Sequence, residues 1–222
     1  MTENIASRIG RQELVSMERR RDLRDYALIF GFQHAKDLLE MVGSQLVAHN
    51  TLLNCGCGDG IADHQAAREL SKLGIIFYAL DRHLPVKRYP SVRYLEGDFT
   101  DAFFLEGSVN MLWSVCCLFM YAENENEIYS QARQLCHILK PSGKAFITVD
   151  PVNFERDPAA KAIRQRTGNE VWIQSPTTPR KHFRTDIANI ISTSGLSIDR
   201  RIIPNGGMMI DDEVTLMIGK RK

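Results

Sequence analysis

The sequence predicts an α/β fold in which a mostly parallel sheet carries helices on both faces. From Thr51 onward, short apolar runs alternate with helix-like segments, which is the pattern of parallel strands joined by crossover helices. The first apolar run leads into three glycines at alternate positions within Thr51–Gly60 (TLLNCGCGDG), and a helix-like segment follows. A glycine turn between a strand and a helix is a common place for a ligand.

The parallel part of the sheet is predicted from five apolar runs and three amphipathic segments. Gly74 ends the helix after the glycine turn, and Pro141–Gly143 predicts a turn into the fifth strand. The strands are expected at Leu52–Cys55, Ile75–Leu80, Val92–Leu95, Val109–Val115 and Lys144–Val149, and the helices at His34–Leu46, Ile61–Leu73 and Asn124–Leu139.

The C-terminal third has a different pattern. Residues 151–183 are rich in proline and polar residues and break the alternation. A helix is expected at Thr185–Ser194, with Thr185 as its N-cap. Leu196–Ile203 and Glu213–Ile218 predict two more strands that pair antiparallel. We therefore expect an N-terminal helical cap region, 1–50, and an α/β domain, 51–222, in which about 151–183 is an insert.

Composition limits the function classes. The chain has 222 residues, 44% hydrophobic and 25% charged, with a formal net charge of +1. This balance predicts no nucleic-acid partner and no membrane partner. No apolar signal core is present, so we expect a cytoplasmic protein with reduced thiols. The cysteine spacing predicts no metal site. The cysteines are Cys55, Cys57, Cys116, Cys117 and Cys136.

Two acidic residues follow later strands of the same sheet. Asp81 closes the second strand, and Asp98 follows the third. In an open α/β sheet, ligands bind at the carboxyl ends of the strands. A carboxylate at Asp81 is well placed to accept hydrogen bonds from both ribose hydroxyls, and Asp98 could accept from an exocyclic amine such as that of adenine.

Together these motifs resemble the class I S-adenosylmethionine-dependent methyltransferases. LLNCGCGDG is similar to their first motif, Ala79–Asp81 (ALD) to the second and Glu96–Phe99 (EGDF) to the third. Leu139–Ile147 (LKPSGKAFI) is similar to the family's turn into strand five. The resemblance implies a Rossmann-like sheet of seven strands, of which the late antiparallel pair forms part.

The resemblance also implies a function and a cofactor site. It implies that S-adenosylmethionine is the cofactor and that its methyl group passes to an acceptor. The first turn would approach the methionine and ribose portion, Asp81 the ribose, the pair Arg82 and His83 the adenine, and Ser114 the sulfonium. The implied cofactor-binding residues are Asn54, Gly56, Cys57, Gly58, Asp81, Arg82, Asp98, Phe99 and Ser114.

The catalytic residues and the acceptor are not identified by these motifs. Tyr121, shortly after the fourth strand, and His182, in the insert, are candidates to orient or deprotonate an acceptor, although a core tyrosine and a surface histidine are the favoured interpretations. The insert and the N-terminal helices are expected to form a substrate lid. A small-molecule acceptor is favoured and a protein substrate is the alternative; the acceptor atom and the oligomeric state stay open.

Two departures from the family support another function. Asn54 stands where the family has an acid two residues before the first glycine, and Asn110 stands where strand four commonly begins with Asp. These departures keep open a non-catalytic binding or regulatory protein with the same fold. A nicotinamide-dependent dehydrogenase is disfavoured, because its G-x-G-x-x-G spacing would need a glycine at Ile61.

Overall fold

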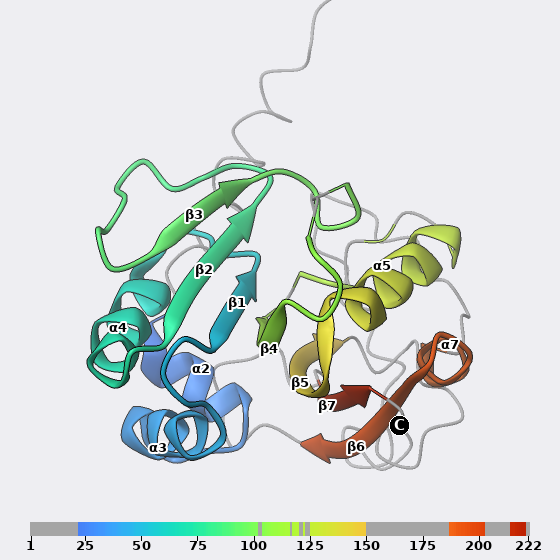
Figure 1. Ribbon diagram of the computed structural model, residues 1–222, viewed down its shortest axis with the longest axis horizontal. Helices are drawn as coiled ribbons and strands as arrows, with labels where there is room; N and C mark the ends of the chain where they lie inside the picture. Colours follow the sequence, from blue (N-terminus) through green and yellow to red (C-terminus); the bar gives the residue numbers. More distant parts are fainter. Residues whose placement is uncertain are drawn as a thin grey trace, which may run out of the picture.

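The computed structural model describes residues 22–101, 104–115, 117–119, 122, 125–149, 187–202 and 214–220. Within them, seven strands form one sheet in the order β3-β2-β1-β4-β5-β7-β6 (Figure 1). The strands β1 to β5 are parallel, and β7 pairs antiparallel with both β5 and β6. The predicted sheet and its late antiparallel pair are confirmed. The strands are β1 Thr51–Cys55, β2 Ile76–Asp81, β3 Arg93–Glu96, β4 Val109–Ser114, β5 Leu139–Val149, β6 Leu196–Ile202 and β7 Val214–Lys220.

Helices cover both faces of this sheet, as the alternation predicts (Figure 1). On one face, α2 (Leu23–Ile29), α3 (Ala35–Gln45) and α4 (Ile61–Leu70) share a core with the inward residues of β1, β2 and β4. On the other face, α5 (Glu125–Ile138) and α7 (Ile187–Thr193) form a second core. In the described residues, no helix is long and apolar enough to span a membrane.

An aromatic cluster fixes α2 to the sheet. Trp113 on β4 has no exposed surface, and its ring lies 6.2 Å from that of Tyr26 and 5.7 Å from that of Phe30, between ring centroids. The helix begins at Asp22, whose side chain caps it while Asp25 bonds back to the Asp22 amide. Capping and aromatic contacts together hold Tyr26 above β1 and β4.

The boundaries of two elements differ most from the sequence prediction. β5 begins at Leu139 rather than Lys144, because the predicted turn is a bulge inside the strand: Val109 pairs with Leu139, and Met111 already pairs with Lys144. The helix after the glycine turn ends at Leu70, and a 3-10 turn (η1, Ser71–Leu73) reaches Gly74. The predicted cap Thr185 lies outside the described residues.

The glycine turn after β1 depends on conformations and contacts that only glycine permits. Gly56 has φ +87° and donates its N–H to the carbonyl of Leu80 at 2.8 Å. A Cβ at this position would lie 2.5 Å from Cβ and 2.9 Å from Sγ of Cys117. Gly60, with φ +74°, is the N-cap of α4. The turn therefore packs directly against the loop that follows β4.

Replacing Gly56 with alanine should destabilise the fold through two additive costs, the left-handed φ and the collision with Cys117. Gly107→Ala is the matched control, because Gly107 has φ +60° and open space where its Cβ would be. We expect about 1 kcal/mol of lost stability for Gly107→Ala, and about 1–3 kcal/mol more for Gly56→Ala. Urea denaturation measures the free energy of unfolding of both variants. Equal losses of stability would show that Cys117 can shift to make room for the new Cβ at no energetic cost.

Candidate functional site

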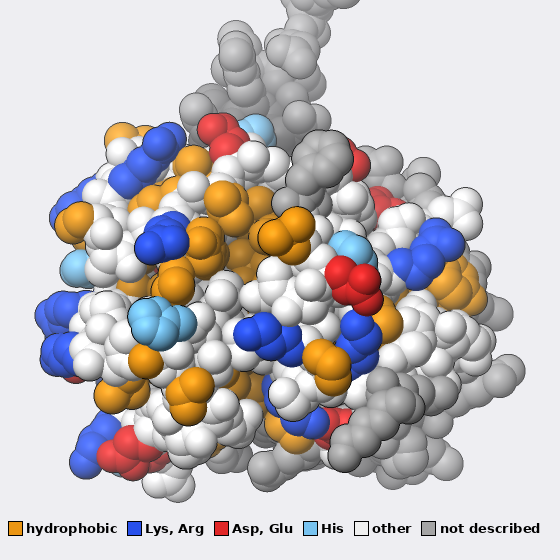
Figure 2. Space-filling model, viewed as in Figure 1, with side chains coloured by type: hydrophobic (Ala, Val, Ile, Leu, Met, Phe, Trp, Pro, Cys, Tyr) orange, Lys and Arg blue, Asp and Glu red, His pale blue; other side chains and the backbone are white. Residues whose placement is uncertain are grey.

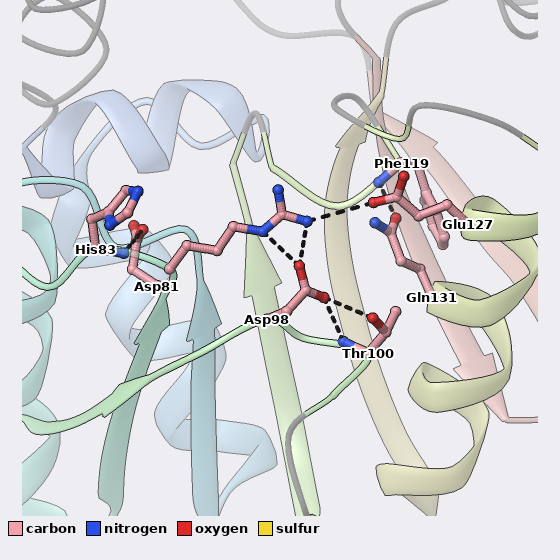
Figure 3. Close-up of polar contacts among 8 residues, drawn as sticks. Asp81, His83, Asp98, Thr100, Phe119, Glu127 and Gln131 are labelled. Carbon is pink, nitrogen blue, oxygen red and sulfur yellow. Dashed lines mark hydrogen bonds and ion pairs between the residues drawn. The ribbon is translucent and has the colours of Figure 1, made fainter.

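Asp81 joins several loops at the carboxyl end of the sheet. Its carboxylate accepts hydrogen bonds from the N–H of Gly58 at 3.1 Å and of His83 at 3.0 Å. Its backbone carbonyl accepts from the N–H of Gly97 at 3.0 Å. Figure 3 shows the Asp81 side chain at the end of its strand with His83 beside it. Each carboxylate oxygen keeps lone pairs for a further donor, such as a hydroxyl.

Arg82 connects the loops after β2 and β3 to helix α5 through Asp98 and Glu127. Figure 3 labels these two acids and draws dashed lines to both. Arg82 Nε donates to Asp98 Oδ2 at 2.5 Å, its Nη2 also pairs with that oxygen, and Nη2 lies 3.6 Å from Glu127 Oε1. The other Asp98 oxygen accepts from the N–H and hydroxyl of Thr100. Burial raises the pKa of Asp98, but the Thr100 and Arg82 hydrogen bonds outweigh it, so this pKa lies below its ordinary value.

A pocket of about 300 Å³ opens at the ends of β2 and β3. The connection from β3 to β4 contains no helix in its described residues, 97–101 and 104–108, so this side of the sheet stays partly uncovered. In Figure 2, hydrophobic side chains gather over β2 and β3 on the same side. The pocket has an apolar floor and an acidic rim, formed by Leu80, Leu95, Phe104, Glu96, Gly97, Asp98 and Asp101.

The loop after β4 is held by buried side chains. Ser114 Oγ accepts from the N–H of Leu118 at 2.9 Å, and Gln131 Oε1 on α5 accepts from the N–H of Phe119 at 2.8 Å. Phe119 is buried and has φ +67°, a conformation that costs a phenylalanine energy. Ser114 therefore fixes this loop from below. Phe99 packs in the core against Phe104 and does not line the pocket.

Asn54 belongs to a buried polar network beneath the glycine turn. Its Nδ2 donates to Asp63 Oδ1 at 2.6 Å and to the hydroxyl of Tyr26 at 3.2 Å. Asp63, in the first turn of α4, is 1% exposed. Asn54 Oδ1 and Asp63 Oδ2 are buried without a hydrogen-bond partner. Two unpaired acceptors at one buried place are costly unless a donor reaches them.

Burial raises the pKa of Asp63 to about 8, against an ordinary value of 3.8. The hydrogen bond from Asn54 opposes this rise, and the charges of Asp59 and Asp81 add to it. Burial also raises the pKa of the Cys57 thiol, with the charges of Asp63 and Asp81 adding to the effect. The polar groups around the turn thus disfavour further negative charge and favour a cation.

The structure brings most of the predicted cofactor residues to one edge of the sheet. Asn54 to Gly58, Asp81, Arg82 and Asp98 all lie at the carboxyl ends of β1, β2 and β3, beside the end of β4. Tyr121 and His182 fall outside the described residues. Asn110 lies at the opposite end, where its Oδ1 accepts from the N–H of Thr51 and ties β4 to β1.

Sequence reasoning missed Tyr26, Asp63 and Gln131. For Asp63 the sequence carries a usable indication. Positions 63, 66, 67 and 70 share one helix face, and the other three are alanine or leucine, so the acid falls on the buried side of α4. Tyr26 and Gln131 reach the site only through the tertiary fold, and no local pattern marks them.

The described cysteines and acidic residues do not form a metal centre. Cys55, Cys57, Cys117 and Cys136 are free thiols. Among the described residues, no group of three or more His, Cys, Asp or Glu could hold a metal ion.

Comparison with known proteins places the fold. No protein-family model matches the sequence, and no curated protein matches it either. Among solved structures, the 1,6-didemethyltoxoflavin-N1-methyltransferase of Burkholderia thailandensis, with bound 1,6-didemethyltoxoflavin and S-adenosylhomocysteine, superposes with a TM-score of 0.58. The match covers 98% of this chain and 89% of that chain at 16% identity. This chain has the class I methyltransferase fold.

Other proteins with the class I methyltransferase fold match as well. A putative methyltransferase of Haloferax volcanii, solved in complex with the activator Trm112, gives a TM-score of 0.54 at 17% identity over 99% of both chains. The cyclase SpnF gives 0.50 at 18% identity, over 76% of this chain and 59% of that chain. Because the fold carries more than one reaction, the function has to be argued from the site.

The buried carboxyl of Asp63 should make stability depend on pH. Because its pKa is raised in the folded protein, the folded state holds this proton more tightly than the unfolded chain. The resulting stabilisation is complete below about pH 4 and is lost as pH rises through about 8. Asp63→Asn should flatten this decline, by a few kcal/mol between pH 5 and 9.

Urea denaturation of the parent and the variant at pH 5, 7 and 9 measures this effect. Asp37→Asn, in the first turn of α3, is the control for losing a helix N-terminal acid elsewhere. Parallel stability curves for parent and Asp63→Asn would contradict a protonated, buried Asp63.

Proposed function

We propose that this protein binds S-adenosylmethionine and transfers its methyl group to a small-molecule acceptor. The observation that carries the proposal is the arrangement at one edge of the sheet of the glycine turn, Asp81 and the Arg82–Asp98 pair. These are the positions at which the sequence resembles the methyltransferase motifs, and the fold is the one those motifs imply.

The residues present fit this cofactor. The Asp81 carboxylate is oriented by two backbone amides and keeps acceptor capacity for the two ribose hydroxyls. The turn at Gly56 has no side chain, so its backbone is open to close approach. When Asp63 is ionised, two buried acceptors, on Asn54 and Asp63, lack a donor that an amino group could supply. The pocket beside Asp98 has an apolar floor suited to a purine ring.

The contribution of the chain to such a reaction is chiefly positional. The sulfonium of the cofactor makes its methyl carbon electrophilic, so an acceptor lone pair can bond to that carbon as the carbon–sulfur bond breaks. Asp81 and the glycine turn would hold the cofactor in place. The loop after β4, fixed by Ser114 and Gln131, would border the acceptor. Orientation of this kind can supply several kcal/mol of the barrier.

The specificity for the methyl acceptor would depend on the segments outside the seven-stranded sheet, namely the N-terminal helical region and the insert. The N-terminal helical region reaches the site through Tyr26, which bonds to Asn54. The insert 151–183 lies outside the described residues, and its role as a lid stays a prediction from sequence. The Burkholderia thailandensis neighbour was solved with the small molecule 1,6-didemethyltoxoflavin bound, which supports a small organic acceptor more than a protein one. A cytoplasmic location, where thiols such as those of the described Cys55, Cys57, Cys117 and Cys136 stay reduced, is part of the proposal.

A non-catalytic binding or regulatory protein is the second candidate, and Asn54 is the observation that favours it. A neutral amide holds a cationic amino group less strongly than the family's acid would. Asn110 no longer adds to this alternative, because its side chain makes a hydrogen bond between strands far from the site.

Titration calorimetry with S-adenosylmethionine and S-adenosylhomocysteine tests the proposed cofactor. We expect saturable binding of both, and no binding of NADH as the control for a generic dinucleotide site. Absence of heat with both adenosyl ligands at near-millimolar concentration would refute the proposal. Methyl transfer to a panel of small molecules, followed by S-adenosylhomocysteine release, then separates an enzyme from a binding protein.

Asp81→Ala should weaken binding of S-adenosylhomocysteine by about 10- to 100-fold, since it removes acceptors for the ribose hydroxyls. Glu40→Ala is the matched control: it removes an exposed carboxylate on α3 that pairs only with Lys36 among the ion pairs described here. Circular dichroism checks that both variants fold. Unchanged affinity in a folded Asp81→Ala protein would show that the ribose does not lie at this residue.

A further inference from the structure

We propose that Asp63 is the positioning residue for the amino group of the cofactor, because it orients the Asn54 amide and supplies the negative charge that Asn54 lacks. This inference rests on the proposed function. It concerns the methionine end of the cofactor, at the place where the sequence departs from the family's acid. In this chain the acid is Asp63 on helix α4, whereas the family has its acid on the strand at the position of Asn54.

The hydrogen bonds of Asn54 determine which of its atoms is available. Both acceptors around Nδ2, Asp63 Oδ1 at 2.6 Å and the Tyr26 hydroxyl at 3.2 Å, engage its N–H groups. The amide oxygen Oδ1 is left buried and unpaired, as is Asp63 Oδ2. An ammonium group offers three N–H donors and no acceptor. The Asn54 amide oxygen can therefore accept a hydrogen bond from an ammonium group. The hydrogen bond to Asp63 keeps the amide from flipping its oxygen and nitrogen.

The charges around Asp63 also favour a cationic group. The titratable groups whose charges interact with it lie on β1, in the glycine turn, on β2 and on β3, and they are acids or neutral donors. None of those interacting groups is a cation. They are Cys55 on β1, Cys57 and Asp59 in the turn, Asp81 on β2 and Tyr94 on β3. Tyr26 on α2 hydrogen-bonds to Asn54. A cationic ligand is thus the missing counter-charge for this part of the site.

Two states of the pair follow from this geometry. When Asp63 is protonated, its O–H can donate to the amide oxygen of Asn54, which then is not free for a ligand. When Asp63 is ionised, it accepts from Nδ2 and leaves Oδ1 available. Because burial raises the pKa of Asp63 to about 8, the protonated state dominates at neutral pH. Binding an ammonium group should therefore release the Asp63 proton.

The test is calorimetric titration of the full chain with S-adenosylhomocysteine between pH 6 and 8, in buffers of different ionisation enthalpy. We expect release of about one proton at pH 7, and an affinity that rises by up to about tenfold per pH unit. The control ligand is 5′-methylthioadenosine, which keeps the adenine, ribose and sulfur but lacks the amino acid portion. It should bind with no proton release and no pH dependence.

Asp63→Asn should abolish the proton release and weaken S-adenosylhomocysteine about tenfold or more, and leave 5′-methylthioadenosine unchanged. The single variant Asn54→Asp places a second carboxyl against Asp63 and should give no gain. The exchange of both, Asn54→Asp with Asp63→Asn, returns the acid to the strand and should restore affinity to within a few-fold of the parent.

The outcomes separate the two levels of inference. If the parent binds neither adenosyl ligand, the proposed function and this inference both fail. If it binds S-adenosylhomocysteine with no proton release and no pH dependence, the role of Asp63 is wrong while the cofactor stands. These measurements use the parent protein, so they decide the question even if a variant does not fold.

Discussion

The carboxylate and carbonyl of Asp81 connect three loops at the carboxyl end of the sheet. Through Gly58, His83 and Gly97 they join the loops after β1, β2 and β3. Backbone amides in these loops would otherwise need water, and a single acid at a strand end satisfies them together. The shape of the candidate site follows from this arrangement, because the glycine turn, Arg82 and Asp98 are all placed by the loops that Asp81 holds.

A second constraint comes from the face of the sheet that α2 and α4 cover. The aromatic cluster around Trp113 fixes α2, and α2 carries Tyr26 to the amide of Asn54. The polar network below the turn therefore depends on apolar packing directly beside it, because Trp113 is the β4 neighbour of Asn54. The free energy of hydrophobic burial offsets the cost of keeping the unpaired acceptors of this network away from water.

The sequence predicted the fold well because its evidence is local. Alternating runs, the glycine turn and Gly74 each report a conformation of the residues that show it. Contacts between segments far apart in the chain could not be predicted as well from the sequence. The bulge before Lys144 arises from pairing with β4, and Phe99 packs in the core although its motif suggests a ligand contact. Asp63 could have been found from its place on the apolar face of α4, but Tyr26, which hydrogen-bonds to Asn54, could not.

The position of β7 has a consequence for the order in which the sheet assembles. Although β7 follows β6 in the chain, it lies between β5 and β6 in the sheet. β6 therefore has no strand neighbour until β7 has been made. During synthesis, α7 and β6 must wait with an unpaired edge while residues 214–220 are made. The contacts that complete this half of the sheet form last, and loss of those few residues would remove an interior strand rather than an edge.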